Sequence, residues 1–71
     1  MFDLAAALAD VDGRQFDFSG LEDLLSRVRR ENLGEISPEV GTRELLMVAI
    51  QRNWIREDED GNFHVQLPKA A

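Results

Sequence analysis

Residues 42–67 read TRELLMVAIQRNWIREDEDGNFHVQL, and this stretch decides the fold. Its first half has the apolar spacing of a helix, which we expect at 42–53. The positions expected to face the core are Leu45, Leu46, Ala49 and Ile50. Because Met47 and Val48 widen the apolar surface, this helix is expected to be the most buried one. The second half alternates apolar and polar residues around Asp60-Gly61, a strong hairpin signal. The stretch therefore predicts a helix that runs into a β-hairpin.

The sequence before this stretch predicts two more helices and a short strand. A short helix is expected at 2–11, and an edge strand at 14–18. The clearest helix is expected at 20–32, where Ser19 and Glu22 have the spacing of a capping box and Gly34 suits a left-handed stop. Ser37-Pro38 then predicts a single helical turn at 38–40 before the third helix.

The resulting order is helix, strand, helix, helix, strand, strand, and over roughly residues 2–67 it resembles the winged-helix family. The resemblance implies an α+β fold, a small three-helix winged-helix-like domain with a C-terminal β-hairpin. In DNA-binding winged helices, the helix before the hairpin enters the major groove. Carried over by position, this implies that Arg43, Gln51 and Arg52 read base edges.

The distribution of charge argues against that role. The net charge is −6, and the hairpin turn carries four consecutive acids, Glu57, Asp58, Glu59 and Asp60. Duplex DNA carries one negative charge per ~1.7 Å, so this tip would be repelled by it. Three arginines at the end of the second helix offer a local basic patch, although cations also complement a helix C-terminus. They are Arg27, Arg29 and Arg30.

Composition makes several kinds of site improbable. A chain of 71 residues makes one domain, and without cysteine it has no disulfide and no thiolate metal ligand. The two Asp-x-Asp-Gly runs, at 10–13 and 58–61, lack the remaining calcium ligands and are interpreted as turns. His64 is the only histidine, expected on the polar side of its strand. We therefore expect no enzyme activity, no cofactor and no metal site.

No run approaches the roughly 20 apolar residues that span a bilayer, and the acidic start does not suit a signal peptide. A soluble cytoplasmic protein without a membrane partner is the expectation. Trp54 could be a buried cap on the core or a partly exposed anchor for a partner, and Phe2 carries the same two interpretations.

Three functions remain open at this level. The first is a non-catalytic adaptor or regulatory module that binds a protein with a basic surface. Its expected contacts are the acidic tip (Glu57, Asp58, Glu59 and Asp60) together with Trp54 and Met47. The second is a nucleic-acid-binding transcriptional regulator that uses Arg43, Gln51 and Arg52. The third is a small acidic inhibitor that mimics nucleic acid and occupies a basic groove on its target.

Overall fold

A short helix starts the fold in the computed structural model, which describes residues 2–68. Helix α1 spans Leu4–Leu8 and continues into a 3₁₀ turn at Ala9–Val11. The carboxylate of Asp3 caps α1 by accepting a hydrogen bond from the Ala6 N–H at 3.2 Å. The helix expected at 2–11 is confirmed, and it begins at Leu4 because Asp3 takes the capping position.

Strand β1 and helix α2 follow directly. Strand β1 covers Gln15–Phe16, so the strand expected at 14–18 exists but is shorter. Helix α2 spans Phe18–Glu31, and the Asp17 carboxylate caps it by accepting a hydrogen bond from the Gly20 N–H at 2.7 Å. The capping box expected from Ser19 and Glu22 is therefore wrong. Asp17 provides the acceptor two residues earlier, and this brings Phe18 into the helix.

Helix α2 does not end at the expected glycine. Asn32 is its C-terminal cap, and the Asn32 side chain donates a hydrogen bond to the Val28 carbonyl at 2.8 Å. Gly34 is not left-handed, so the predicted stop at that residue is wrong. The expected turn at 38–40 exists as a hydrogen-bonded turn and not as helix, with the Val40 N–H donating to the Ser37 carbonyl at 2.9 Å.

Helix α3 spans Thr42–Gln51. Its N-terminal cap is Gly41, whose N–H donates a hydrogen bond to the Glu44 carboxylate at 3.0 Å. It ends earlier than the expected residue 53 because Asn53 adopts a left-handed conformation with φ of 63°. The Asn53 N–H donates to the Ile50 carbonyl at 3.0 Å, and the Trp54 N–H donates to the Ala49 carbonyl at 2.9 Å. This pair of bonds is a Schellman motif, which turns the chain from α3 into the sheet.

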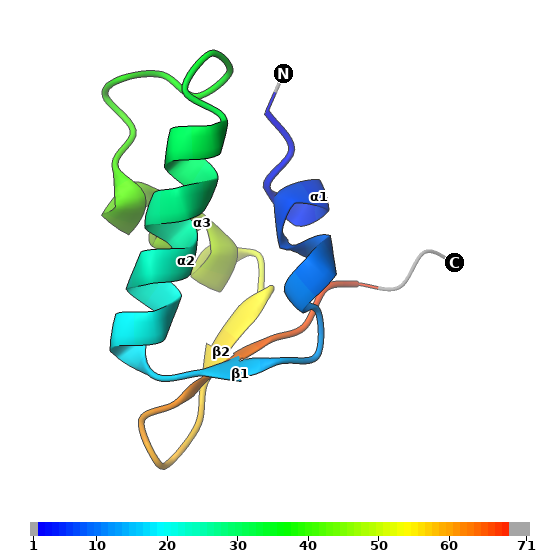
Figure 1. Ribbon diagram of the computed structural model, residues 1–71. Coiled ribbons are helices and arrows are strands. Elements are labelled where there is room, and N and C mark those ends of the chain that lie inside the picture. The colour runs from blue at the N-terminus through cyan, green and yellow to red at the C-terminus, as the bar shows by residue number, and fades with distance from the viewer. Residues whose placement is uncertain (1, 69–71) are drawn as a thin grey trace.

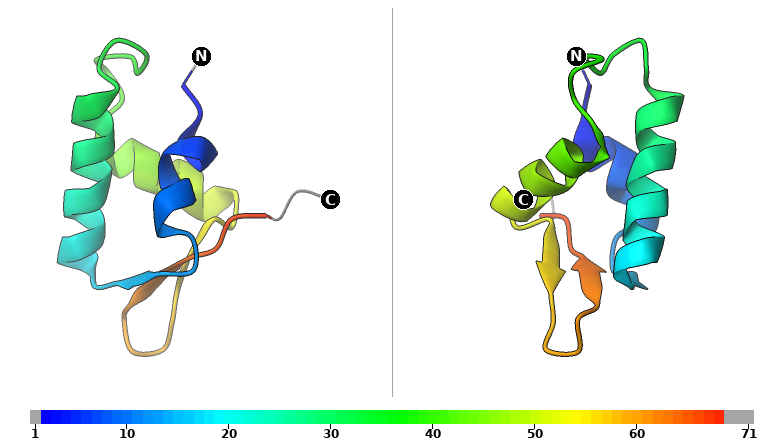
Figure 2. Two further views of the ribbon diagram at one scale, coloured as in Figure 1. Left: turned by 45° about the vertical axis from the view of Figure 1, so that its right-hand side comes forward. Right: turned by 90° about the vertical axis from the view of Figure 1, so that its left-hand side faces the viewer.

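The sheet has three antiparallel strands in the order β1-β3-β2. Strands β2 (Ile55–Glu57) and β3 (Phe63–Val65) form the expected hairpin, and β1 pairs with the other edge of β3. Gly61, with φ of 83°, provides the left-handed residue that the hairpin loop requires. The helices lie on one side of the sheet, and the loop between β2 and β3 projects away from them (Figures 1 and 2). The predicted small α+β domain with a C-terminal hairpin is confirmed.

The core lies between the helices and the inner face of the sheet. Its apolar side chains are Leu4, Leu8, Val11, Leu21, Leu24, Leu25, Val28, Ile36, Leu45, Ala49, Ile55, Phe63 and Val65. Helix α3 contributes only two of them, so the expectation that it is the most buried helix is wrong. Met47, Val48 and Ile50 are 54%, 40% and 45% exposed, and Ile50 does not face inward as expected. The reason is geometric. The six consecutive apolar residues at 45–50 point around the whole helix at about 100° per residue, whereas the core covers only one side of it.

Candidate interaction surfaces

Only some of the four carboxylates in the acidic tip are free to bind a partner. Glu57, Glu59 and Asp60 are exposed, but Asp58 is committed to the loop itself. Its Oδ1 accepts hydrogen bonds from the N–H groups of Asp60 and Asn62, both at 2.9 Å. Three carboxylates of the run therefore remain free for a partner, and the fourth holds the turn in shape.

The other oxygen of Asp58 pairs with the lone histidine. Asp58 Oδ2 lies 2.7 Å from His64 Nε2, and both side chains are partly exposed. The hydrogen bond from His64 holds the pKa of the Asp58 carboxyl below its usual value of 3.8, and the N–H groups of Asn62 and Asp60 lower this pKa further. His64 does lie on the outer side of β3, opposite Arg56 of β2, but its role is to fasten the hairpin loop.

The burial of Trp54 is intermediate between a buried cap on the core and an exposed anchor for a partner. Its indole is half-buried against the core, and the Arg52 guanidinium carbon lies 5.8 Å from the ring centroid. Trp54 lines a shallow hollow together with Phe2, Leu45 and Val48. Phe2 is likewise half-buried. Trp54 thus closes one flank of the core and leaves part of its ring accessible.

Met47 lies on the outward side of α3, within a second stripe of that helix. The stripe consists of Arg43, Leu46, Met47 and Ile50, which have the i, i+3, i+4, i+7 spacing of one helix face. Leu46 is half-buried and packs against the core, as the sequence predicted, whereas the other three are exposed. Helix α3 is therefore apolar on two sides, one that packs into the core and one that faces solvent.

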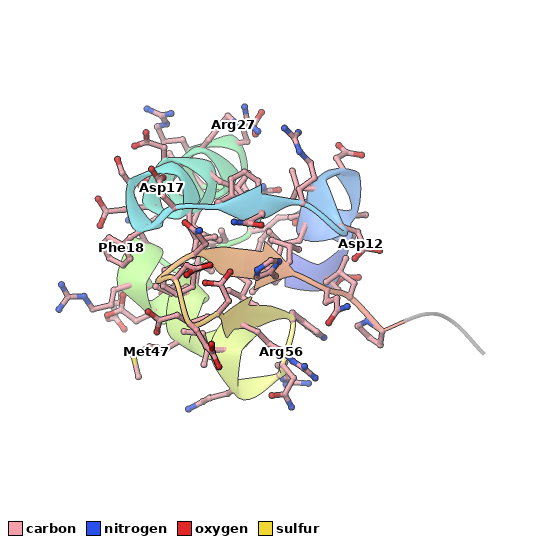
Figure 3. All side chains as sticks on the ribbon, turned by 90° about the horizontal axis from the view of Figure 1, so that it is seen from below. Asp12, Asp17, Phe18, Arg27, Met47 and Arg56 are labelled. Carbon is pink, nitrogen blue, oxygen red and sulfur yellow. The ribbon has the colours of Figure 1, made fainter. Side chains whose placement is uncertain are left out.

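Phe18 extends this outward surface onto α2. Phe18, Leu25 and Leu46 line one shallow hollow between the start of α2 and α3. The Phe18 side chain is 53% exposed, and its ring centroid lies 6.0 Å from that of Phe63. Figure 3 shows Phe18 and Met47 at the same edge of the molecule, with Arg56 away from it. We call the surface formed by Phe18, Leu46, Met47 and Ile50 the α3 face.

The three residues expected to read bases do not share one side of α3. Arg43 and Arg52 are nine positions apart, which at about 100° per residue places them on opposite sides of the helix axis. Arg52 lies over the Trp54 ring, and Gln51 is the last residue of the helix. The neighbours of Arg43 on its own stripe are apolar.

The cluster of three arginines on α2 is also divided. Arg29 is half-buried, and its guanidinium donates hydrogen bonds to the carbonyls of Val40 at 2.7 Å and Pro38 at 3.4 Å. It fastens the loop before α3 onto α2. Only Arg27, at 3.9 Å from Glu31, and Arg30 are exposed.

The α3 face contains Ile50, which the sequence predicted to face inward, and Phe18, which was expected in the strand at 14–18 and lies instead in the first turn of α2. A signal for Ile50 was present, because a helix with apolar residues at every position from 45 to 50 must expose some of them. Phe18 had no such signal, since its placement depends on which acceptor caps α2.

Several kinds of site are absent from residues 2–68. No group of three or more acidic or histidine side chains is arranged to hold a metal ion there. In the same range, no helix is both long enough and apolar enough to cross a membrane. Comparisons with family models, curated proteins and solved structures gave no match to this chain.

Proposed function

We propose that this domain is a non-catalytic protein-interaction module that contacts its partner through the α3 face. The observation that carries the proposal is the exposure of Phe18, Met47 and Ile50 around the half-buried Leu46. Leu46 lines one hollow with Phe18 and shares one helix stripe with Met47 and Ile50. Scattered single apolar residues are normal on protein surfaces, but contiguous apolar patches mark contact sites. The acidic composition adds long-range attraction towards a basic partner.

The winged-helix resemblance supports the same assignment as an adaptor or regulatory module. The helix that precedes the hairpin is the one used for recognition in that family, and here its outward stripe is apolar rather than basic. The acidic tip lies at the end of the projecting hairpin, where three exposed carboxylates can steer a partner. In this arrangement the apolar face provides affinity and the tip provides orientation.

Site-specific photocrosslinking tests the proposal. A photoreactive amino acid replaces Met47 in one version of the chain and Leu33 in a matched control, since Leu33 is also exposed (56%) but lies in the loop after α2. We expect a discrete protein adduct from position 47, in cells that produce the chain, and none from position 33. The adduct should disappear when Ile50→Glu is combined with the label. Equal labelling from both positions, or no adduct from 47, would contradict the proposal.

Nucleic-acid binding stays the alternative, and a duplex titration separates it from the proposal. Micromolar binding that weakens steeply with salt and is lost on Arg52→Ala would favour the regulator. The acidic-inhibitor alternative predicts that Glu57→Gln and Glu59→Gln abolish binding to a basic target while Met47→Ala does not. Under the proposal, the Met47 variant has the larger effect.

A further inference from the structure

The α3 face presents an apolar helix stripe to solvent, with a small hollow beside it. On α3 its apolar residues are Leu46, Met47 and Ile50, and they continue a stripe that begins at Arg43. From 43 to 50 this stripe is about 10 Å long at ~1.5 Å per residue. A small hollow between α2 and α3 lies beside this stripe. It is lined by Phe18, Leu25 and Leu46 and also by Glu22, Thr42 and Arg43. An amphipathic helix of two or three turns can pack its own apolar stripe against this stripe of α3, with one side chain over the hollow.

The rim of the face is acidic. Asp17 is the residue before Phe18, and Glu22 lines the hollow itself. On the hairpin side, Glu57 is paired across the strands with Phe63, whose ring contacts Phe18. None of these three carboxylates forms an ion pair with any residue of 2–68, although Oδ1 of Asp17 accepts the hydrogen bond that caps α2. The only cation on the stripe is Arg43.

Charge decides between a foreign helix and a second copy of this chain. A symmetric dimer would bring the same acidic rim against itself, and each protomer carries a net charge of −6. Arg43 alone cannot offset three carboxylates on each side. A helix that has lysine or arginine residues on both sides of its apolar stripe meets the rim with opposite charge and the stripe of α3 with apolar side chains.

We infer that the partner presents a basic amphipathic helix, seated between α2 and α3 on the α3 face. This inference rests on the proposed function and specifies the chemistry of the partner. The aliphatic residues of the helix cover Met47 and Ile50, and its cationic residues lie opposite Asp17, Glu22 and Glu57.

A pair of model peptides tests the inference. The first is a labelled helix of about five turns, with leucines at i, i+3, i+4 and i+7 and lysines elsewhere. The second replaces each lysine by glutamate. Fluorescence anisotropy is measured with the full chain at about 0.15 M salt, where the Debye length is ~8 Å and weak surface attraction is screened. We expect saturable binding of the lysine peptide and none of the glutamate peptide.

Charge-adding variants separate docking from general attraction. Ile50→Glu and Met47→Glu make the chain more acidic, yet we expect each to weaken binding of the lysine peptide by roughly ten- to hundredfold because an apolar contact is lost. Leu33→Glu adds the same charge outside the face and should not weaken it. Arg43→Ser removes the one repulsive cation and should tighten binding a fewfold. Circular dichroism of each variant checks that the fold is intact, and two independent variants guard against a folding defect in either.

Binding of the lysine peptide that is unchanged or stronger in Ile50→Glu and Met47→Glu overturns the inference, since attraction would then be electrostatic alone. A dimer by light scattering that dissociates on Ile50→Glu also overturns it, because the occupant would be a second copy. An adduct from position 47 without any lysine-peptide binding refutes the basic helix but leaves the proposed function standing. Absence of both the adduct and peptide binding refutes the two together.

Discussion

Replacing Asn53 should reveal how much the exit from α3 depends on one left-handed residue. An L-amino acid in this conformation costs about 1–2 kcal/mol, and asparagine tolerates it better than residues with branched side chains. Because the Asn53 side chain is exposed, a substitution there removes no core packing. We expect Asn53→Val to lower the free energy of unfolding by about 1–2 kcal/mol. For a domain of this size, each 1 kcal/mol corresponds to a fall in Tm of about 4–8 °C.

Asn53→Gly is the informative companion. Glycine relieves the strain at φ of 63°, which stabilises the fold. It also raises the entropy of the unfolded chain, which destabilises the fold by about 0.5–1 kcal/mol, so the net change in the free energy of unfolding should be small. Gln51→Val is the matched control, since it places the same side chain on the exposed surface at the end of α3, where the cost is at most ~0.7 kcal/mol. Urea unfolding is followed by circular dichroism and by fluorescence of Trp54, the only tryptophan. If Asn53→Val is as stable as Asn53→Gly, the backbone argument fails.

Three further outcomes are expected. Folding lowers the pKa of the Asp58 carboxyl, so the stabilisation by this carboxylate is present above about pH 4 and is lost as the pH falls through the folded-state pKa. In urea unfolding, the difference in stability between the wild type and Asp58→Asn should therefore shrink below pH 3.8. Leu25→Ala, at a fully buried position, should lower the free energy of unfolding by about 2–5 kcal/mol in the same assay. The exposed Leu33→Ala should change it by no more than about 0.5 kcal/mol. Arg29→Ala should lower the free energy of unfolding by about 1.5–3 kcal/mol, because it leaves the Val40 carbonyl without its charged donor. If Arg30→Ala lowers it by as much, Arg29 does not stabilise the loop before α3 in this way.

The elements of this fold could be predicted because their signals are local. The apolar stripe of Leu21, Leu24, Leu25 and Val28 defines α2, and all four residues are buried. The Asp60-Gly61 turn defines the hairpin, and Gly61 takes the left-handed conformation that the signal requires. These features depend on residues within one or two turns of each other, which is the range in which sequence patterns are informative.

The boundaries and the outward side of α3 could not be predicted in the same way. Both Asp17 and Ser19 are good N-cap residues, and nothing local decides between them, although the choice moves Phe18 from strand to helix surface. Similarly, the run 45–50 does not reveal which of its residues meet the core, namely Leu45, Leu46 and Ala49. That choice depends on the angle at which α3 crosses α2 and the sheet. The candidate surface therefore became visible only in three dimensions.

The order of strands in the sheet also constrains how the chain can fold. The central strand, β3, is the last one in the sequence, and β1 pairs only with it. Pairing Gln15 with His64 closes a loop of 49 residues, whereas the hairpin pairs Arg56 with His64 across eight. The longer closure costs about 1.5 kcal/mol more in chain entropy. The hairpin is thus favoured to form before β1 docks, and a growing chain on the ribosome cannot complete its sheet until the segment after Gly61 has emerged.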